Sequence, residues 1–178
     1  IVEGSNFRFG RGREGDGGLL NTLENRSNIN FEEVPVDEVS SSRVRDAINA
    51  GDMARARELL GRPYSISGIV VEGAGRGRTL GFPTANLDSV PTLIPAPGVY
   101  AVNAHAYDCR GAANVGANPT FGEDARKIEV HLIGYGGNLY GEDLRVEFLQ
   151  RIRDTKAFAT VDELVQQVKT DIATAEKL

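Results

Sequence analysis

The densest group of residues that could do chemistry is a glycine-rich stretch at residues 72–87, EGAGRGRTLGFPTANL, directly after an apolar segment. Glycines permit positive φ angles and close backbone approach, so successive amide N–H groups can point at one anion. Arginines add charge-assisted hydrogen bonds to phosphate oxygens. The stretch is neither a Walker A loop nor a dinucleotide-binding fingerprint. Composition alone therefore leaves two interpretations open, a phosphate-binding loop and a flexible surface turn.

Two side chains in the second half of this stretch carry oxygen atoms that suit a divalent cation. Thr84 and Asn86 are two residues apart, and Pro83 biases Phe82 toward extended backbone. In an extended segment, Thr84 and Asn86 face the same way. A hydroxyl and a carboxamide oxygen are hard ligands that suit Mg²⁺ bound to nucleotide phosphates. The alternative is a Thr and an Asn that only satisfy turn amides.

Glu129 is a candidate general base because it lies on a predicted strand. The apolar residues of segment 127–133 alternate, which leaves Glu129, His131 and Ile133 on the other face. A carboxylate on a rigid strand can be aimed at a substrate hydroxyl, and a general base contributes about 10²–10⁴-fold to rate. The alternative for Glu129 is a solvated strand carboxylate. For His131 we expect a packing or hydrogen-bonding role.

The elements that must position these residues differ between two parts of the chain. Residues 64–152 predict short strands separated by Gly, Pro, Asn and Asp, which is typical of an antiparallel barrel or sandwich. Residues 160–178 predict one helix with a capping-box spacing between Thr160 and Glu163. Residues 1–60 predict helices with Gly-rich or acidic connectors. In that part, Asp52 is an expected N-cap and Gly61 an expected helix stop.

Composition limits the class of protein. The 178 residues fit one ordinary domain, or one small domain with a piece of another, and the missing initial Met predicts a fragment. No apolar run approaches the roughly 20 residues of a membrane helix. The net charge of −5 argues against general nucleic-acid binding. A single cysteine, Cys109, excludes an internal disulfide and suits the cytoplasm.

The motif GRGRTLGFPTANL resembles the ATP-binding stretch of the riboflavin kinase family, whose hallmark is Pro-Thr-Ala-Asn after a glycine-rich loop. Further similar segments follow in the family's order: PAPGVYAV, ANVGANPTFG, KIEVHLIGY, LYGEDLRVEFLQRIRDTKAF and the closing helix TVDELVQQVKTDIATAEKL. The resemblance covers residues 61–178. It implies a small, Greek-key-like antiparallel β-barrel with a C-terminal helix. It also implies phosphorylation of the riboflavin 5′-hydroxyl to FMN, with ATP as phosphoryl donor and Mg²⁺ as cofactor.

The resemblance also implies a role for each matching residue. Glu129 is the catalytic base, and Thr84 and Asn86 hold the magnesium and the ATP phosphates. The other positions at the nucleotide are Gly73, Gly75, Gly77, Arg78, Leu132, Gly134 and Tyr140. The positions at the flavin are Arg153, Lys156 and Phe158. From the residues alone, the segment RDTKAF is equally an ordinary strand-to-helix loop.

Residues 1–60 resemble the C-terminal part of the FMN adenylyltransferase domain, which precedes the kinase in bacterial bifunctional FAD synthetases. The run Ser40–Arg45 matches the second nucleotide-binding motif of that α/β domain. Serine hydroxyls, a helix N-terminus and arginines make a good phosphate site, although a capped helix alone explains them. The family's first motif, ending in His-x-Gly-His, is absent, and no histidine precedes His105. We expect adenylyltransferase activity in the parent protein and none in this chain.

Two other classes of protein compete with the kinase. The alternative is a non-catalytic flavin-binding β-barrel, which needs no magnesium–triphosphate site such as the glycine-rich loop with Thr84 and Asn86. A nucleic-acid-binding barrel requires a basic, aromatic-rich face, and the chain has no tryptophan and an acidic balance. The expected partners are therefore the small molecules riboflavin and ATP, with no nucleic acid and no membrane, besides the adenylyltransferase domain of the parent.

Overall fold

The computed structural model describes residues 2–4, 8–24, 32–34, 40–118, 120 and 123–178. The chain divides into two compact units, Ile1–Ser40 and Ser41–Leu178. The domain boundary expected after residue 60 lies inside the second unit, because the two helices before it belong to the same unit as the strands after it. Assignment of residues 1–60 to a separate domain remains a prediction.

The first unit contains an α/β arrangement. Strands β1 (Val2–Gly4) and β2 (Glu32–Val34) pair in parallel, and helix α1 (Gly17–Glu24) lies between them in sequence. Parallel pairing requires such a crossover connection. A short 3₁₀ turn, η1 (Arg11–Arg13), precedes α1. Residues 25–31, which include part of the strand predicted at INFEEVPV, lie outside the described residues.

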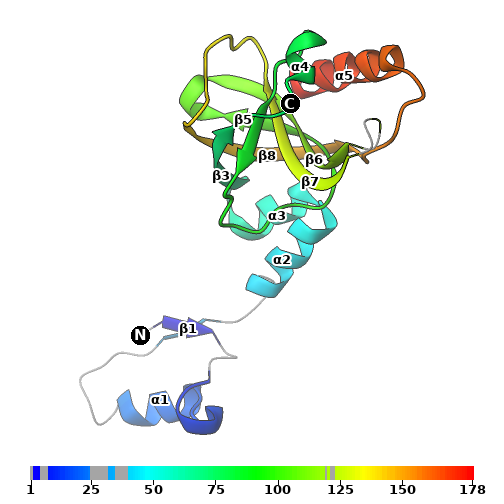
Figure 1. The fold of residues 1–178 in the computed structure, drawn as a ribbon. Coiled ribbons are helices and arrows are strands. Elements are labelled where there is room, and N and C mark those ends of the chain that lie inside the picture. The colour runs from blue at the N-terminus through cyan, green and yellow to red at the C-terminus, as the bar shows by residue number, and fades with distance from the viewer. Residues whose placement is uncertain (1, 5–7, 25–31, 35–39, 119, 121–122) are drawn as a thin grey trace. The chain divides into compact units, whose positions relative to one another are not determined.

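The second unit contains a closed barrel of six antiparallel strands in the order β3-β4-β7-β6-β5-β8 (Figure 1). The strands are β3 (Tyr64–Val71), β4 (Ala85–Asp88), β5 (Gly98–Ala104), β6 (Cys109–Asn118), β7 (Glu123–Leu132) and β8 (Asp143–Arg153). The structure therefore confirms the predicted barrel. The four-residue strand β4 was expected only as extended backbone.

Alternating residues of these strands fill the barrel. Successive side chains of a strand point to opposite faces, so each strand contributes every second residue to the core. The interior residues include Ile66, Val70, Leu87, Val102, Val115, Val130, Leu144 and Phe148. In β7, the buried residues Ile128, Val130 and Leu132 alternate with half-buried Glu129 and His131, as predicted. The outward face of the strands is therefore available to build a site.

Two consecutive helices, α2 (Ser41–Ala50) and α3 (Met53–Leu60), precede the barrel. Gly51 separates them with a φ of 74°, and the carboxylate of Asp52 accepts a hydrogen bond from the Arg55 amide at 2.9 Å. Gly61 ends α3 in the left-handed conformation. The predicted break, N-cap and stop are thus confirmed. Met53 belongs to the barrel core cluster, which ties the helices to the strands.

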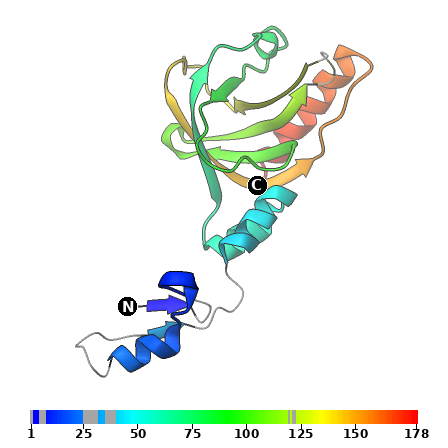
Figure 2. The same ribbon diagram turned by 60° about the horizontal axis from the view of Figure 1, so that its bottom comes forward.

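Helix α5 (Val161–Ala175) packs along one side of the barrel (Figures 1 and 2). Its N-cap is Thr160, whose hydroxyl accepts a hydrogen bond from the Glu163 amide at 3.2 Å, as the capping-box spacing predicted. The glycine-rich loop contains a short helix that was not predicted, α4 (Arg76–Thr79), and a 3₁₀ turn, η2 (His105–Tyr107), follows β5. Among the described residues, no helix has the length and apolar character of a membrane span.

Candidate active site

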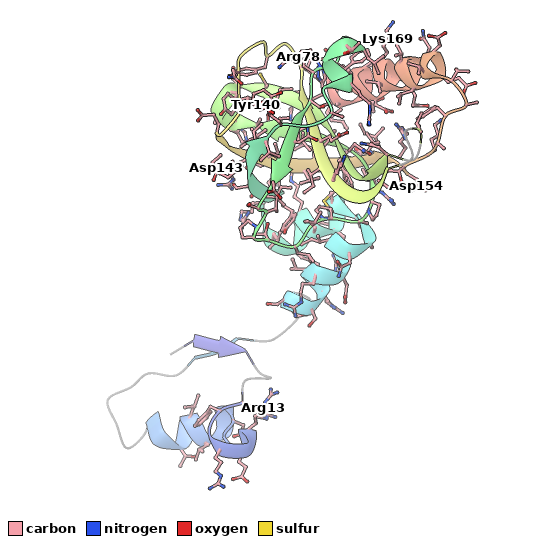
Figure 3. All side chains as sticks on the ribbon, in the orientation of Figure 1. Arg13, Arg78, Tyr140, Asp143, Asp154 and Lys169 are labelled. Carbon is pink, nitrogen blue, oxygen red and sulfur yellow. The ribbon has the colours of Figure 1, made fainter. Side chains whose placement is uncertain are left out.

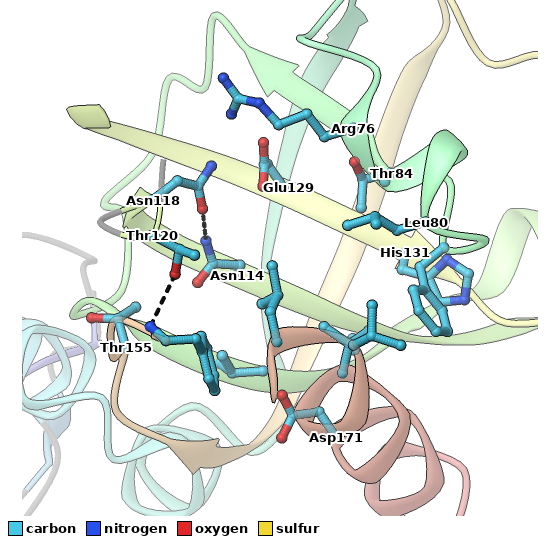
Figure 4. A pocket seen from close by; sticks show the side chains of 18 of the residues that line it. Arg76, Leu80, Thr84, Asn114, Asn118, Thr120, Glu129, His131, Thr155 and Asp171 are labelled. Carbon is cyan, nitrogen blue, oxygen red and sulfur yellow. Dashed lines mark hydrogen bonds between the residues drawn. The ribbon is translucent and has the colours of Figure 1, made fainter. Parts of the chain in front are cut away.

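A pocket lies on the outer face of the barrel, bounded by β4, β7 and β6, by the glycine-rich loop with α4, and by α5 (Figure 4). Side chains of α5 provide an apolar wall made of Leu164, Val165, Val168 and Ile172. The loop provides Gly75, Arg76, Gly77 and Leu80, and the barrel strands provide mainly polar side chains. The pocket therefore combines one apolar side with one polar side.

A row of side chains in register crosses the barrel face beneath the pocket. Asn86 of β4 lies opposite Glu129 of β7, and Glu129 lies opposite Asn114 of β6. The row continues through Val99 of β5 to Arg153 of β8. Neighbouring strands are about 4.8 Å apart. The Glu129 carboxylate is thus flanked by two carboxamides, and one residue predicted for the metal, Asn86, shares the row with one predicted for the flavin, Arg153.

Glu129 is half-buried and points into the pocket, where Figure 4 shows it beside Thr84 and Arg76. Within the part of the chain that the structure describes, no hydrogen bond or ion pair engages its carboxylate. A carboxylate that lies on a rigid strand, with its oxygens open to the pocket, can accept a proton from a bound hydroxyl. This geometry suits a general base.

The glycine-rich loop rests directly on the two candidate metal ligands. A Cβ atom on Gly73 would overlap the carboxamide of Asn86. A Cβ atom on Gly77 would overlap the carbonyl oxygen of Phe82 and lie 3.2 Å from Oγ1 of Thr84. Only glycine lets the backbone approach these groups so closely. Gly75, with a φ of 70°, forms the N-cap of α4.

His131 holds the segment that carries Thr84. Its Nδ1 donates a hydrogen bond to the Pro83 carbonyl at 2.8 Å, and its ring meets Phe82 edge-on at 6.1 Å between centroids. Because the acceptor is a carbonyl, Nδ1 carries the proton. This confirms the packing and hydrogen-bonding role predicted for His131.

A second hollow also borders the Pro83–Thr84 segment. It contains three of the residues predicted at the nucleotide, Arg78, Leu132 and Tyr140, with other lining residues from segment 135–139 (Figure 3 labels Arg78 and Tyr140). Thr84 lines both hollows. Gly73 and Gly134 line neither of the two, and Gly134 adopts a φ of 76° in the turn after β7.

The three residues predicted at the flavin lie together at the end of the row. The Phe158 ring centroid is 5.0 Å from Lys156 Nζ and 5.8 Å from the guanidinium carbon of Arg153. Lys156 Nζ donates to Oε1 of Gln167 on α5 at 2.9 Å. The Phe158 amide donates to Oγ1 of Thr120 at 3.3 Å. The loop after β8 is thereby attached both to α5 and to the segment after β6.

Several pocket residues escaped the sequence analysis. They are Asn114, Asn118, Thr120, Thr155 and Asp171. Asn114 occupies an outward position of β6, but nothing in the sequence says that β6 lies beside β7. Asp171 carried a signal that was overlooked, because it is a buried carboxylate on the apolar stripe of α5.

The donor set fits a magnesium ion bound together with nucleotide phosphates. Thr84 and Asn86 offer a hydroxyl and a carboxamide oxygen, and they line the same pocket as expected from their spacing. Among the described residues no cluster of three His, Cys, Asp or Glu side chains exists. Mg²⁺ usually retains waters and takes one or two protein ligands with phosphate oxygens, so such a cluster is not required.

Comparisons with known proteins place the barrel in a family. The family described as "Flavokinase: Riboflavin kinase" matches residues 60–178. A bifunctional riboflavin kinase/FMN adenylyltransferase of Escherichia coli K12 is 39% identical, over 99% of this chain and 59% of its own length. The protein of the same name from Bacillus subtilis 168 is 41% identical, over 75% of this chain and 44% of its own length.

A solved structure also resembles the chain along nearly all of its length. The crystal structure titled "Macrolide-efflux Protein" from Streptococcus pneumoniae matches with a TM-score of 0.84 and 36% identity, over 98% of this chain and 59% of that chain. The chain thus spans somewhat more than half the length of the Escherichia coli relative and of this solved chain. Together with the family match over residues 60–178, these likenesses show that the chain belongs to the riboflavin kinase family.

Proposed function

We propose that this chain transfers the terminal phosphoryl group of ATP to the 5′-hydroxyl of riboflavin, forming FMN and ADP. The observation that carries the proposal is the position of Glu129. Its carboxylate lies in register with Asn86, next to Thr84, under a glycine-rich loop and at one end of a pocket with an apolar wall. A phosphoryl acceptor and its base, the phosphate groups and a flat apolar ring system can all be accommodated there.

The chemistry requires a hydroxyl group to become a nucleophile. As the 5′-oxygen forms its bond to the γ-phosphorus, its proton passes to a carboxylate oxygen of Glu129. The bond between the γ-phosphorus and the β–γ bridging oxygen breaks, and ADP leaves with that electron pair. Phosphoryl transfer depends mainly on positioning and on charge neutralisation. Backbone amides of the loop at Gly75 and Gly77 would supply hydrogen bonds to the transferring group.

Magnesium, when bound with ATP, neutralises phosphate charge and aligns the phosphoryl group with its acceptor. In this chain, Thr84 and Asn86 would hold it. Thr84 lines both hollows, so it suits a position between a nucleotide on the side of Arg78 and Tyr140 and an acceptor on the side of Glu129.

The flavin ring would occupy the apolar side of the first pocket. Aliphatic side chains of α5 line that side, and the Phe158 ring belongs to the same pocket. An isoalloxazine has a flat apolar body with polar edges, so burial of its faces contributes roughly 25 cal/mol per Å². Lys156 lies near the aromatic ring and would meet a polar edge, and Arg153 lies beside the same ring.

A non-catalytic flavin-binding barrel is the alternative function. The packing of Gly73 and Gly77 on Asn86 and Thr84 favours the kinase, because a passive flavin site needs no phosphate loop in contact with candidate metal ligands. The proposal covers the kinase reaction alone, and the adenylyltransferase named in the relatives belongs to a longer protein. We place the reaction in the cytoplasm, where ATP and reduced thiols occur, which suits the single Cys109.

The test is direct. Purified chain is incubated with riboflavin and ATP, with Mg²⁺ or with excess EDTA, and FMN is separated from riboflavin by chromatography. We expect FMN and ADP in equal amounts with Mg²⁺, and no FMN with EDTA. Folded chain that binds riboflavin but forms no FMN under any of these conditions would support the passive barrel instead.

A further inference from the structure

The polar side of the first pocket contains a group of uncharged side chains beside the candidate base. Asn114, Asn118, Thr120 and Thr155 all line the pocket, and Figure 4 shows them together, on the side of Glu129 away from Thr84. Asn114 is the member in register with Glu129, on the neighbouring strand β6. This group has no role in phosphoryl transfer as described above.

Asn114 is held in a defined orientation. Its Nδ2 donates a hydrogen bond to Oδ1 of Asn118 at 3.1 Å, four residues further along the chain. The two amide groups of the pair therefore do not rotate independently. Since Asn118 engages one hydrogen of the Asn114 amide nitrogen, the carbonyl oxygen and the second N–H of Asn114 are the groups that it can offer to a ligand in the pocket.

The chemistry of this group favours a neutral ligand over an anion. Its four side chains carry no charge and lie beside the Glu129 carboxylate, and hydroxyl groups both donate to and accept from carboxamides and threonine hydroxyls. A neutral polyol chain is the ligand that matches a row of uncharged donors and acceptors. Riboflavin carries such a chain between its ring and the terminal hydroxyl.

We propose that Asn114, oriented by Asn118, recognises the secondary hydroxyls of the polyol chain and thereby makes the enzyme specific for ribityl flavins. The inference rests on the proposed function, because it takes the terminal hydroxyl to lie at Glu129. From there, one strand spacing of about 4.8 Å leads to Asn114. This distance is covered by a short stretch of the polyol chain on its way to the apolar wall formed by α5.

The experiment compares two acceptors. One is riboflavin, and the other is the same ring system with a 5-hydroxypentyl chain, which keeps the terminal hydroxyl and lacks the three secondary ones. We expect the unmodified chain to use riboflavin with a kcat/KM at least about tenfold higher. When a ligand leaves polar groups of its site without hydrogen bonds, kcat/KM falls by about this factor for each missing neutral hydrogen bond. Equal kcat/KM values for the two acceptors would overturn the proposal.

Variants of the chain test whether Asn114 causes the difference in kcat/KM between the two acceptors. Asn114→Leu has a similar volume and cannot form the hydrogen bonds, so it should lose about tenfold in kcat/KM with riboflavin and less than about threefold with the hydroxypentyl analogue. Asn118→Ala should lose less, because it frees the orientation of Asn114 and leaves the Asn114 side chain in place. Asn103→Ala on β5 changes an asparagine that pairs with His105 outside the pocket, and both acceptors should react as before.

Two further measurements keep the outcomes distinct. The affinities of the chain for riboflavin and for the hydroxypentyl analogue are measured by quenching of flavin fluorescence. If Asn114→Leu does not fold, Asn114→Ala is used in its place. An equal loss for both acceptors in folded variants would make Asn114 a structural residue and overturn the inference. Absence of FMN with unmodified chain would instead overturn the kinase itself, while selective riboflavin binding through Asn114 would still be seen by fluorescence.

Discussion

The guanidinium of Arg153 at the end of β8 donates three hydrogen bonds to the carboxylate of Asp171 on α5. The Nε atom lies 3.0 Å from both carboxylate oxygens, and a terminal nitrogen lies 2.7 Å from Oδ2. Asp171 is only 3% exposed, and Gln167 donates to the same carboxylate at 2.9 Å. Arg153 is thus engaged by the helix before any flavin arrives, so it acts in this structure as an anchor for the loop that carries Phe158.

Asp171→Asn should therefore affect both stability and flavin binding. Loss of the charge leaves a largely buried guanidinium without its counter-ion, which costs about 3 kcal/mol in free energy of unfolding. We also expect a several-fold higher KM for riboflavin and an unchanged KM for ATP. Urea unfolding and steady-state kinetics check the two parts. Asp162→Asn, an exposed acid at the start of the same helix, should change stability by less than about 1 kcal/mol.

Gly73→Ala should lower activity without unfolding the protein. The new Cβ atom overlaps the carboxamide of Asn86, so either the loop or the Asn86 side chain must move. Because Gly73 is exposed, the thermal unfolding midpoint should shift by little. We expect kcat/KM for ATP to fall about tenfold or more, since a small displacement of a positioned group has a large effect on rate. Unchanged kinetics would show that the loop adapts, and would remove Asn86 from the site.

Thr84→Ala and Thr84→Ser separate a ligand from a turn residue. If the hydroxyl binds magnesium, Ala should weaken Mg²⁺-dependent nucleotide binding, and Ser should restore most of it because it keeps the oxygen. Calorimetric titration with a non-hydrolysable ATP analogue, with and without Mg²⁺, measures this difference. Equal affinity of Thr84→Ala and the unmodified chain in the presence of Mg²⁺ would assign Thr84 to backbone structure.

Local sequence patterns predicted the strands and the long helix. They did not predict which residues from different strands come together in the site. Alternation predicted which residues of β7 face the pocket, and a capping box predicted where α5 begins. Asn114 was missed because its position beside Glu129 depends on the pairing of β6 with β7, and register between strands is a long-range property. Helix α4 was missed because its four residues include a glycine, which disfavours a helix.

Tyr64 should make stability depend on pH at the alkaline end. Its hydroxyl donates to the Leu93 carbonyl at 2.6 Å, and burial raises its pKa above the ordinary value of 10, although a hydrogen bond with Thr92 lowers it in part. The folded state therefore holds this proton more tightly than the unfolded chain. The resulting stability is complete below pH 10 and is lost as the pH rises through the raised pKa.

Tyr64→Phe tests that assignment. We expect a loss of about 1 kcal/mol in free energy of unfolding at neutral pH, because one hydrogen bond disappears. The alkaline decline should also become shallower than in the unmodified chain. Part of it should persist, since burial also raises the pKa of Tyr107. Urea unfolding at a series of pH values gives both quantities, and parallel declines in the two proteins would contradict the role given to Tyr64.

Glu129→Gln addresses the base itself. The amide keeps the size of the side chain and its place between Asn86 and Asn114, but it cannot accept the proton of the attacking hydroxyl. We expect kcat to fall at least about a hundredfold while ATP affinity stays within about threefold, because the change removes an interaction made only in the transition state. Single-turnover kinetics with saturating riboflavin separates this loss from slower product release.

Glu147→Gln on β8 is the matched control for that substitution. Glu147 pairs with His105 at 2.8 Å, outside the pocket, so the same loss of charge should leave kcat within about twofold of the unmodified chain. If the two glutamine variants lose the same factor, the effect is one of net charge and not of proton transfer. If Glu129→Gln retains full turnover, the carboxylate positions the acceptor and water or phosphate takes the proton. The row of side chains from Asn86 to Arg153 would then serve only to bind the flavin.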